Sequence, residues 1–470
     1  MKFKRLLLNT FLFLLTAQYA NCAEIVYPKA KLVTINSPTT FFVGSENPSK
    51  SLKINNEPVT IHSSGGFFHP VELNIGENIF QITNGSKTDI YKITRTPEKV
   101  QTEPKEILYP EIKTYVIKTD NAPLRAIPYD GGMTRLQHYN KGLPLNIVGE
   151  YGNFYKVKLA RDDYGWIGKQ YVARIQGFDN SPARIDGFIY DESPSKRTFT
   201  LKLSKKIPFI LSETRCFKMD ANYSHLEPFT NGLDFVAYNV KGYPENKYEF
   251  HINSTGKSFG YKAYYKTDKE LVIEVNNFLE IDLNQPLKGI KITLDPGHGG
   301  KENGATGCLG DKEKNINLSL ALKLKTELEK AGAIVFLTRN DDRYVDLYNR
   351  VKQSQNNNSD IFISIHHNAL PDSGANSERS GTATYYFYQQ SKELADKIHN
   401  SMLENLKLKD DEVREASYAV IRNSESLAIL LEVGYMINPD DNSKIITDEF
   451  QQKAAEAIKQ GLENYFNGNK

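Results

Sequence analysis

The chain has 470 residues, which is too long for a single hydrophobic core and predicts about three domains. Its 39% hydrophobic and 25% charged residues are typical of globular proteins and exclude a disordered or fibrous chain. The formal net charge of +2 excludes the strong basic excess of a typical nucleic-acid-binding protein, so we expect no nucleic-acid partner.

Residues 1–23 have the three parts of a secretory signal peptide. Basic residues lie at 2–5, the apolar run 6–15 is too short to span a membrane, and small residues at 20–23 offer a cleavage site. Cys22 would be the lipid acceptor of a lipoprotein, but the residues before it do not fit that signal. We therefore expect an exported protein of the periplasm, the cell envelope or the medium, with no transmembrane anchor.

Residues 24–96 contain short β-type runs separated by turn signals, such as the run 79–82 between Gly76-Glu77-Asn78 and Asn84-Gly85. This spacing predicts a small β-sandwich, which resembles bacterial immunoglobulin-like modules in pattern. Residues 97–111 contain three prolines and several charges, which is the composition of a linker.

Residues 112–175 predict a small β-barrel. The alternating end of the segment 149–159 is typical of a half-buried strand, and Gly165-Trp166-Ile167-Gly168 follows it. With the leading Ala122-Pro123-Leu124-Arg125, these segments resemble a bacterial Src-homology-3-like domain, a type that often grips cell-wall peptide. Trp166 has two open interpretations, a binding residue or a core residue of a spacer barrel.

Residues 176–285 alternate apolar and polar residues, as in 199–203 and 271–275, and predict a further β domain. It weakly resembles the amidase N-terminal β modules of secreted wall amidases.

Residues 286–470 change in pattern, because strand-like runs now alternate with helical stripes. We expect strands at 290–294, 333–337, 361–365, 383–387 and 427–433, and helices at 313–331, 392–403 and 448–466. The alternation predicts an α/β domain with a mostly parallel twisted sheet and helices on both faces. Gly332 is suited to end the first helix.

Four polar residues lie at element ends in this domain: His298, Glu313, His366 and Glu432. Ligands of such sheets gather at the carboxyl ends of strands, and two histidines with one carboxylate are a known zinc set that leaves a position for water. Glu432 interrupts an apolar run, where burial raises a carboxyl pKa toward that of a neutral-pH base. We expect Glu313 as the carboxylate ligand and Glu432 as the proton carrier, with the reverse assignment also open.

The same segments resemble the zinc-dependent N-acetylmuramoyl-L-alanine amidases of the third amidase family. The matching motifs are Leu294-Asp295-Pro296-Gly297-His298-Gly299-Gly300, Lys312-Glu313, Leu337-Thr338-Arg339, Ser364-Ile365-His366-His367-Asn368 and Leu431-Glu432-Val433-Gly434. The resemblance implies one zinc ion on His298, Glu313 and His366, with Glu432 as the catalytic acid/base. It also implies a peptidoglycan substrate cleaved between the N-acetylmuramic lactyl group and L-alanine.

Other positions are expected to be secondary. His367 follows the ligand histidine, and we expect it to be a solvated neighbour, with contact to the substrate as the alternative. Arg339, Arg350 and Arg422 match family positions, and we expect structural roles for them. Asp410-Asp411-Glu412 stands where the family has a basic residue and glycine. Regulated members of the family that these segments resemble carry a long insertion near the short polar loop 369–380, so the resemblance implies an open site that needs no activator.

Two rival functions remain open from the sequence: another zinc peptidase of wall peptides, and a non-catalytic wall-binding protein. Cys308 is a further candidate, as a nucleophile beside His298, but a small loop residue is the interpretation that we favour. Cys216 and Cys308 lie in different predicted domains, so we expect no disulfide between them. We expect a monomer.

Overall fold

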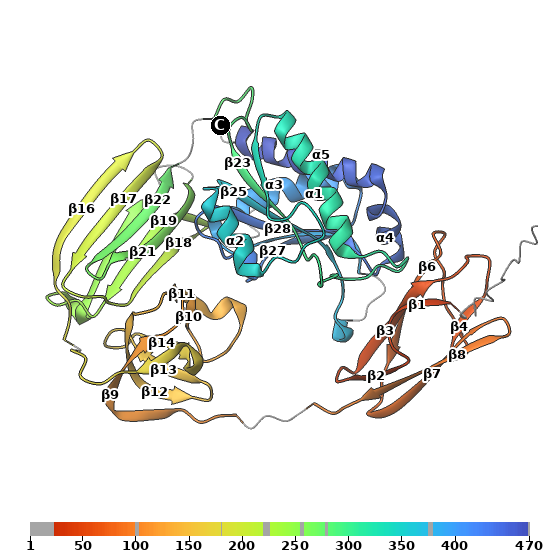
Figure 1. Ribbon diagram of the computed structural model, residues 1–470, viewed down its shortest axis with the longest axis horizontal. Coiled ribbons are helices and arrows are strands. Elements are labelled where there is room, and N and C mark those ends of the chain that lie inside the picture. The colour runs from red at the N-terminus through yellow and green to blue at the C-terminus, as the bar shows by residue number, and fades with distance from the viewer. Residues whose placement is uncertain are drawn as a thin grey trace, which may run out of the picture. The chain divides into compact units, whose positions relative to one another are not determined.

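The computed structural model describes residues 23–98, 103–179, 181–219, 226–253, 258–277, 281–374 and 379–468. The expected signal peptide before residue 23, including Cys22, lies outside these ranges. The chain divides into two compact units, Met1–Pro97 with Pro371–Ser377, and Glu98–Leu370 with Glu378–Lys470 (Figure 1). Within the described ranges no helix is both long and apolar enough to cross a bilayer.

The first unit contains two β-sheets around one apolar core. One sheet has the strand order β1-β3-β6 and the other β2-β8-β7-β4-β5. Phe42, Phe67, Ile82 and Ile93 are fully buried in the core. The strands are β1 (Glu24–Tyr27), β2 (Leu32–Ile35), β3 (Thr39–Ser45), β4 (Leu52–Ile54), β5 (Glu57–Pro58), β6 (Gly66–Glu72), β7 (Gly76–Asn84) and β8 (Lys87–Arg95). The all-β expectation for this segment is confirmed.

The second unit begins with a seven-stranded sheet of order β11-β10-β14-β13-β12-β9-β15. Its strands are β9 (Ile107–Ile117), β10 (Ala122–Arg125), β11 (Arg135–Tyr139), β12 (Pro144–Tyr151), β13 (Phe154–Lys158), β14 (Tyr164–Gly168) and β15 (Val172–Arg174). Trp166 on β14 is only 8% exposed, as expected of a core tryptophan.

Strand β9 starts inside the segment 97–111 that we expected to be a linker. Its pairing with β12 jumps from Lys113 opposite Ile147 to Leu108 opposite Gly149. Pro110 falls within this irregularity, where no ladder hydrogen bond from its nitrogen is required. A proline-rich segment can therefore extend the sheet.

Two further sheets follow, with orders β16-β17-β22-β21 and β18-β19-β20. Their strands are β16 (Ile185–Ser193), β17 (Lys196–Leu203), β18 (Phe209–Met219), β19 (Leu226–Tyr238), β20 (Lys247–Asn253), β21 (Ser258–Thr267) and β22 (Glu270–Asn277). Leu201, Phe235, Leu271 and Ile273 are buried in one core shared by the two sheets. This part is the expected further β domain.

The C-terminal part is an α/β domain around a six-stranded sheet of order β24-β23-β25-β28-β26-β27. Its elements are β23 (Lys291–Pro296), α1 (Glu313–Lys330), β24 (Ile334–Leu337), α2 (Leu347–Asn356), β25 (Ile361–Asn368), β26 (Thr382–Tyr386), α3 (Lys392–Leu406), β27 (Asp410–Glu415), β28 (Leu427–Tyr435), α4 (Pro439–Ile445) and α5 (Asp448–Asn467). All strand pairs are parallel except β26 with β28. The expected strands and helices are confirmed, and α2, β27 and α4 are additional.

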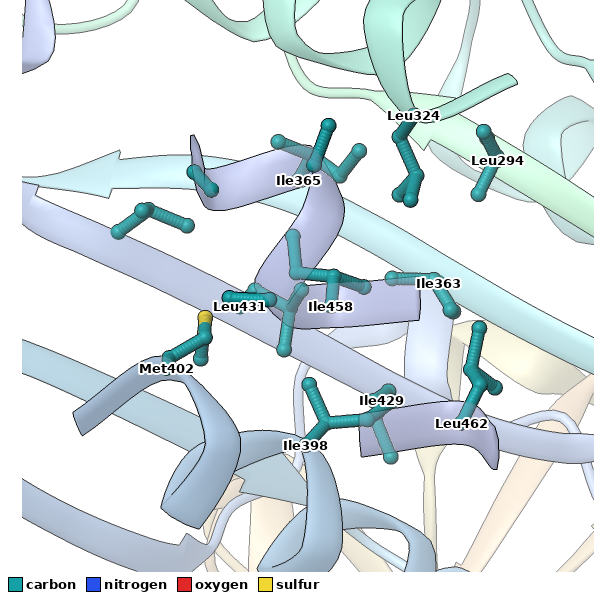
Figure 2. Packing of buried hydrophobic residues seen from close by; sticks show 14 of the residues in the cluster. Leu294, Leu324, Ile363, Ile365, Ile398, Met402, Ile429, Leu431, Ile458 and Leu462 are labelled. Atoms are coloured by element: carbon teal, nitrogen blue, oxygen red, sulfur yellow. The ribbon is translucent and has the colours of Figure 1, made fainter. Parts of the chain in front are cut away.

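Side-chain alternation along β25 and β28 explains why both faces of the sheet are covered. Ile363, Ile365, Ile429 and Leu431 pack with α1, α3 and α5 in one core (Figure 2). The intervening Phe362, Ala428 and Leu430 pack on the other face with Val351 of α2. Because successive residues of a strand point to opposite faces, these nearly continuous apolar runs require helices on both.

Candidate metal centre

Three polar residues from distant parts of the chain meet at the carboxyl end of the central strands. His298 follows β23, Glu313 is the first residue of α1, and His366 lies near the end of β25. One donor atom from each lies within 4.8 Å of the other two. The Glu313 carboxylate lies between the imidazoles, with Oε2 3.1 Å from His298 Nε2 and Oε1 3.0 Å from His366 Nδ1.

The parallel register of the sheet produces this gathering. Pro296 of β23 pairs with Ile365 of β25, and His366 pairs with Glu432 of β28. Parallel strands held in this register end at one edge of the sheet, so the residues at their ends converge there. The sequence predicted that each of these residues lies at the end of a strand or the start of a helix, and the strand register of the sheet brings them together.

Glu313 is held as an anion by its surroundings. Burial opposes its ionisation, but hydrogen bonds from His298 and His366 lower the pKa of Glu313 well below its usual range. The amide nitrogen of Ala305 donates to Oε2 at 2.8 Å, and Asn317 Nδ2 donates to Oε1 at 3.1 Å. The positive end of the α1 dipole also favours a carboxylate at this position.

Glu432 has the opposite electrostatic environment. Burial, with a further contribution from the charge of Glu313, raises the pKa of Glu432 well above its usual range. Its Oε2 atom is shielded from solvent and has no hydrogen-bond partner among the described groups. Glu432 is not one of the three gathered donors. The pKa values of these two carboxyl groups are therefore shifted in opposite directions by their surroundings.

Two buried arginines fix the turn that carries His298. Arg350 donates to the carbonyl oxygens of Pro296 at 2.8 Å and His298 at 2.7 Å. Arg339 donates to the carbonyl oxygens of Pro296 at 2.9 Å and Gly297 at 2.8 Å. His298 has a φ of +59°, which is uncommon for a residue with a side chain. The arginines stabilise this turn, which agrees with the structural role expected for both.

Two glycines leave room for the imidazoles. A Cβ on Gly297 would lie 2.2 Å from His366 Cε1. A Cβ on Gly304, which has a φ of +68°, would lie 2.7 Å from His298 Cδ2 and 2.3 Å from Glu313 Oε2. Any side chain at either position would displace a donor of the cluster.

His367 differs from our expectation of a solvated neighbour. It is buried, and its Nδ1 lies 2.7 Å from Asn317 Oδ1. Strand β25 continues to Asn368, so His367 points to the same face as Ile363 and Ile365 and is covered there. Burial lowers the pKa of His367 to about 4, so the ring is neutral at pH 7.

Asn317 is a site residue that our sequence interpretation missed. It bonds Glu313 and His367, and its Nδ2 also lies 3.3 Å from the carbonyl oxygen of Gly297. The available signal was its spacing of four residues from Glu313, because such residues share one face of a helix.

Cys308 is a buried free thiol that accords with the non-catalytic interpretation. Its Sγ donates to Asn442 Oδ1 at 3.0 Å. Burial, assisted by the charge of Asp311, raises the pKa of the Cys308 thiol to about 12, so no thiolate forms at neutral pH.

The donor set fits a divalent metal. Two imidazoles and a carboxylate held as an anion can bind zinc and leave a coordination position for a ligand, and the two glycines keep space around them. Hydrogen bonds to Glu313 from Ala305 and Asn317 orient that carboxylate, as outer partners of a metal site do.

Comparison with known proteins finds relatives of the α/β domain that carries these residues. The family model described as N-acetylmuramoyl-L-alanine amidase matches residues 292–464. The "Probable cell wall amidase LytH" of Staphylococcus epidermidis is 37% identical over 222 residues, covering 46% of this chain and 73% of that protein.

Two further matches are proteins named as amidases. The "N-acetylmuramoyl-L-alanine amidase LytC" of Bacillus subtilis is 35% identical over 184 residues, covering 39% of this chain and 37% of that protein. The solved structure of the amidase AmiC2 of Nostoc punctiforme is 34% identical, covers 38% of this chain and 98% of that chain, and has a TM-score of 0.36.

Proposed function

Because the chain belongs to the N-acetylmuramoyl-L-alanine amidase family, we propose that it hydrolyses peptidoglycan at the amide between the N-acetylmuramic lactyl group and L-alanine. The observation that supports this proposal is the gathering of His298, Glu313 and His366 beside the proton-binding Glu432. An amide hydrolase needs a site that stabilises an oxyanion and a group that carries a proton to the leaving amine.

The three gathered donors would hold one zinc ion. A bound zinc ion would supply a Lewis acid that polarises the scissile carbonyl and lowers the pKa of water. Glu313 contributes its charge, and Arg350 and Arg339 hold the His298 turn in place. The chain itself thus keeps the ligand set oriented for the metal.

Glu432 would act as the acid/base residue. In its ionised form the Glu432 carboxylate would take a proton from the attacking water, and the resulting carboxylic acid would give that proton to the L-alanine nitrogen; a raised pKa favours this exchange near neutral pH. The unpartnered Oε2 is free of a competing hydrogen bond from the described groups. In this proposal Glu313 is the metal ligand and Glu432 is the proton carrier. It is the first of the two assignments that the sequence left open.

The direct test is digestion of isolated sacculi by the purified chain, with products identified by mass spectrometry. An amidase releases intact stem peptides with a free L-alanine amine, whereas a wall peptidase cuts within the stem. Metal analysis should give one zinc ion per chain, lost in His298→Ala but not in the control His251→Ala of the β domain. Release of shortened peptides would favour the peptidase rival.

A variant of Glu432 tests whether this residue is needed for catalysis, independently of zinc binding. Loss of general acid/base catalysis typically costs about 10²–10⁴-fold in rate, so Glu432→Gln should lose activity by that factor while retaining zinc. Glu329→Gln, on the exposed face of α1, is the matched control. Sacculi that are bound but never digested would favour the wall-binding rival.

We also propose where the protein acts and what its β domains contribute. The basic and apolar start of the sequence supports export to the periplasm, the cell envelope or the medium, and the β domains at 24–96, 112–175 and 176–285 would serve as wall-binding or spacing modules. The protein would act as a monomer. Its loop 369–380 lies partly outside the described residues, and activator independence is tested by assaying the purified chain alone.

A further inference from the structure

A cavity of about 960 Å³ lies within the second unit, where the seven-stranded domain, the following β domain and the α/β domain meet. Its lining includes Arg135 of β11 and Arg422, which follows the short helix η6 (Ala419–Ile421). The proposed amidase chemistry does not use either residue.

The two arginines converge on one hydroxyl group. Arg135 Nη1 lies 3.2 Å from Ser417 Oγ, and Arg422 Nη1 lies 3.3 Å from the same oxygen. Arg422 also donates to the carbonyl oxygen of Ser417 at 2.5 Å. The domains are in close contact here, since a Cβ on Gly132 would lie 2.6 Å from the Ser417 Cβ.

Neither guanidinium has an acidic partner among the described residues. Every ion pair found within 4.0 Å in those ranges involves other cations, and Arg135 Nε is buried without a hydrogen bond. Burial lowers the pKa of Arg422, and the charge of Arg135 adds to this effect. Arg422 also has a hydrogen bond with Tyr348, and Arg135 Nη1 donates to the carbonyl oxygen of Gly132 at 2.9 Å, but these partners are neutral. Two half-buried like charges without an acidic partner are a costly arrangement unless an anion is bound near them.

The three acidic residues that line the cavity, Asp120, Glu213 and Glu425, have other partners. Asp120 accepts a hydrogen bond from the amide nitrogen of Lys141 at 3.0 Å. Glu213 accepts hydrogen bonds from the amide nitrogens of Gln389 and Gln390 at 2.6 and 2.8 Å. Glu425 forms an ion pair with Lys262 at 2.9 Å. Positive charge at Arg135 and Arg422 therefore remains available for a ligand.

The arginine pair is connected to the strand that carries Glu432 through Ser417 and the neighbouring Tyr418. Ser417 precedes Tyr418, whose ring contacts that of Tyr385 at 5.2 Å between centroids. Tyr385 lies on β26, the strand that pairs with the Glu432 strand. Burial raises the pKa of Tyr418 to about 12, with contributions from Tyr385 and Glu432. A chain of contacts therefore leads from the arginines through Tyr418 and Tyr385 to β28, the strand that carries Glu432.

We propose that Arg135, Arg422 and Ser417 bind an oxyanion of the wall polymer, so that the seven-stranded domain completes the substrate site. The inference rests on the proposed peptidoglycan hydrolysis. The ligand class is a carboxylate or a phosphate, since a guanidinium fork matches two oxygens of either group. The two sources are a carboxylate of the stem peptide and a phosphodiester of a wall-linked polymer.

Calorimetric binding to the full chain carrying Glu432→Gln tests the proposal without consuming substrate. The probes are an N-acetylmuramoyl tripeptide with free carboxylates, the same compound with carboxamides, and inorganic phosphate. Arg135→Ala should weaken binding of the acid form by about tenfold or more and leave the amide form unchanged, as expected for loss of a charge-assisted pair. Arg135→Lys should give an intermediate loss because it keeps the charge but not the fork.

The matched control is Arg161→Ala, an exposed arginine of the same domain, which should bind all probes as the parent does. If only phosphate binding falls in Arg135→Ala, the site is supported and its source is a phosphate. Equal binding of every probe by the parent, Arg135→Ala and Arg422→Ala would overturn the proposal. Digestion of sacculi by the unmodified chain is scored separately, so failure of the proposed function is distinguishable from failure of this site.

Discussion

Arg350 donates a hydrogen bond from Nη2 to the main-chain carbonyl oxygen of His298 at 2.7 Å. The same side chain forms a buried ion pair with Asp295 at 2.7 Å. Asp295 also accepts from Thr338 at 2.6 Å and Ser364 at 2.8 Å. A network centred on one buried acid thereby connects three parts of the α/β domain to the turn that presents a candidate metal ligand.

Replacing Arg350 by alanine should destabilise the domain strongly. Removing one partner of a buried ion pair costs about 3–5 kcal/mol, because the charge of Asp295 remains buried without its partner. The free energy of unfolding in urea measures this loss. Arg343→Ala is the control, since its ion pair with Asp341 is long, at 3.7 Å, and exposed, and it should change stability by less than about 1 kcal/mol. Equal losses in both variants would contradict the prediction.

Glu432→Gln should raise the stability of the metal-free protein at neutral pH. The folded-state pKa of Glu432 is raised, so its contribution to stability is fully present below the ordinary glutamate pKa of about 4.3 and is lost as pH rises through the folded-state value. The neutral amide has no such loss. The Tm advantage of the variant should therefore grow from acid to neutral pH.

Thermal unfolding in the presence of a chelator, from pH 4 to pH 8, checks this sign. The gain at neutral pH should be about 1.4 kcal/mol for each unit by which the pKa of Glu432 is raised in the folded protein. Glu329→Gln should show no growing advantage. A gain for Glu432→Gln that is constant over the whole range would disprove the raised pKa.

Gly297→Ala should weaken zinc binding although all three proposed ligands remain in the chain. The added methyl group would lie 2.2 Å from His366 Cε1 and must push that imidazole away. We expect zinc affinity to fall by at least about tenfold, as when metal ligands lose their orientation, and stability to fall by about 1–3 kcal/mol. Gly187→Ala is the control, because its Cβ would lie 3.7 Å from the nearest atom. Competition titration with a zinc chelator measures the affinity.

Cys308 should resist alkylation in the folded protein. Burial raises its thiol pKa to about 12, so the reactive thiolate is nearly absent at pH 8. Iodoacetamide should modify it at least about a hundredfold more slowly in the native protein than in guanidinium, as followed by peptide mass spectrometry. Similar rates in both states would show that the thiol is accessible and would reopen a chemical role for it.

The sequence predicted most of the α/β domain because its apolar runs and helical stripes are regular. Gly332, with a φ of +89°, ends α1 as expected from its lack of a side chain. By contrast, α2 and β27 are short and rich in polar residues, so no apolar run marked them in the sequence. The start of β9 was predicted as linker because of its proline, but Pro110 falls in a local break of the strand pairing, where it does not interrupt the sheet.

By itself the sequence determined which residue types stand at which element ends: His298, Glu313, His366 and Glu432. Only the tertiary structure decided that Glu313, and not Glu432, lies between the imidazoles, and that His367 is buried. The physical reason is that these outcomes depend on strand register and on packing between distant segments. The meeting of Arg135 with Arg422 at Ser417 likewise depends on contact between two domains, which no local pattern in the chain encodes.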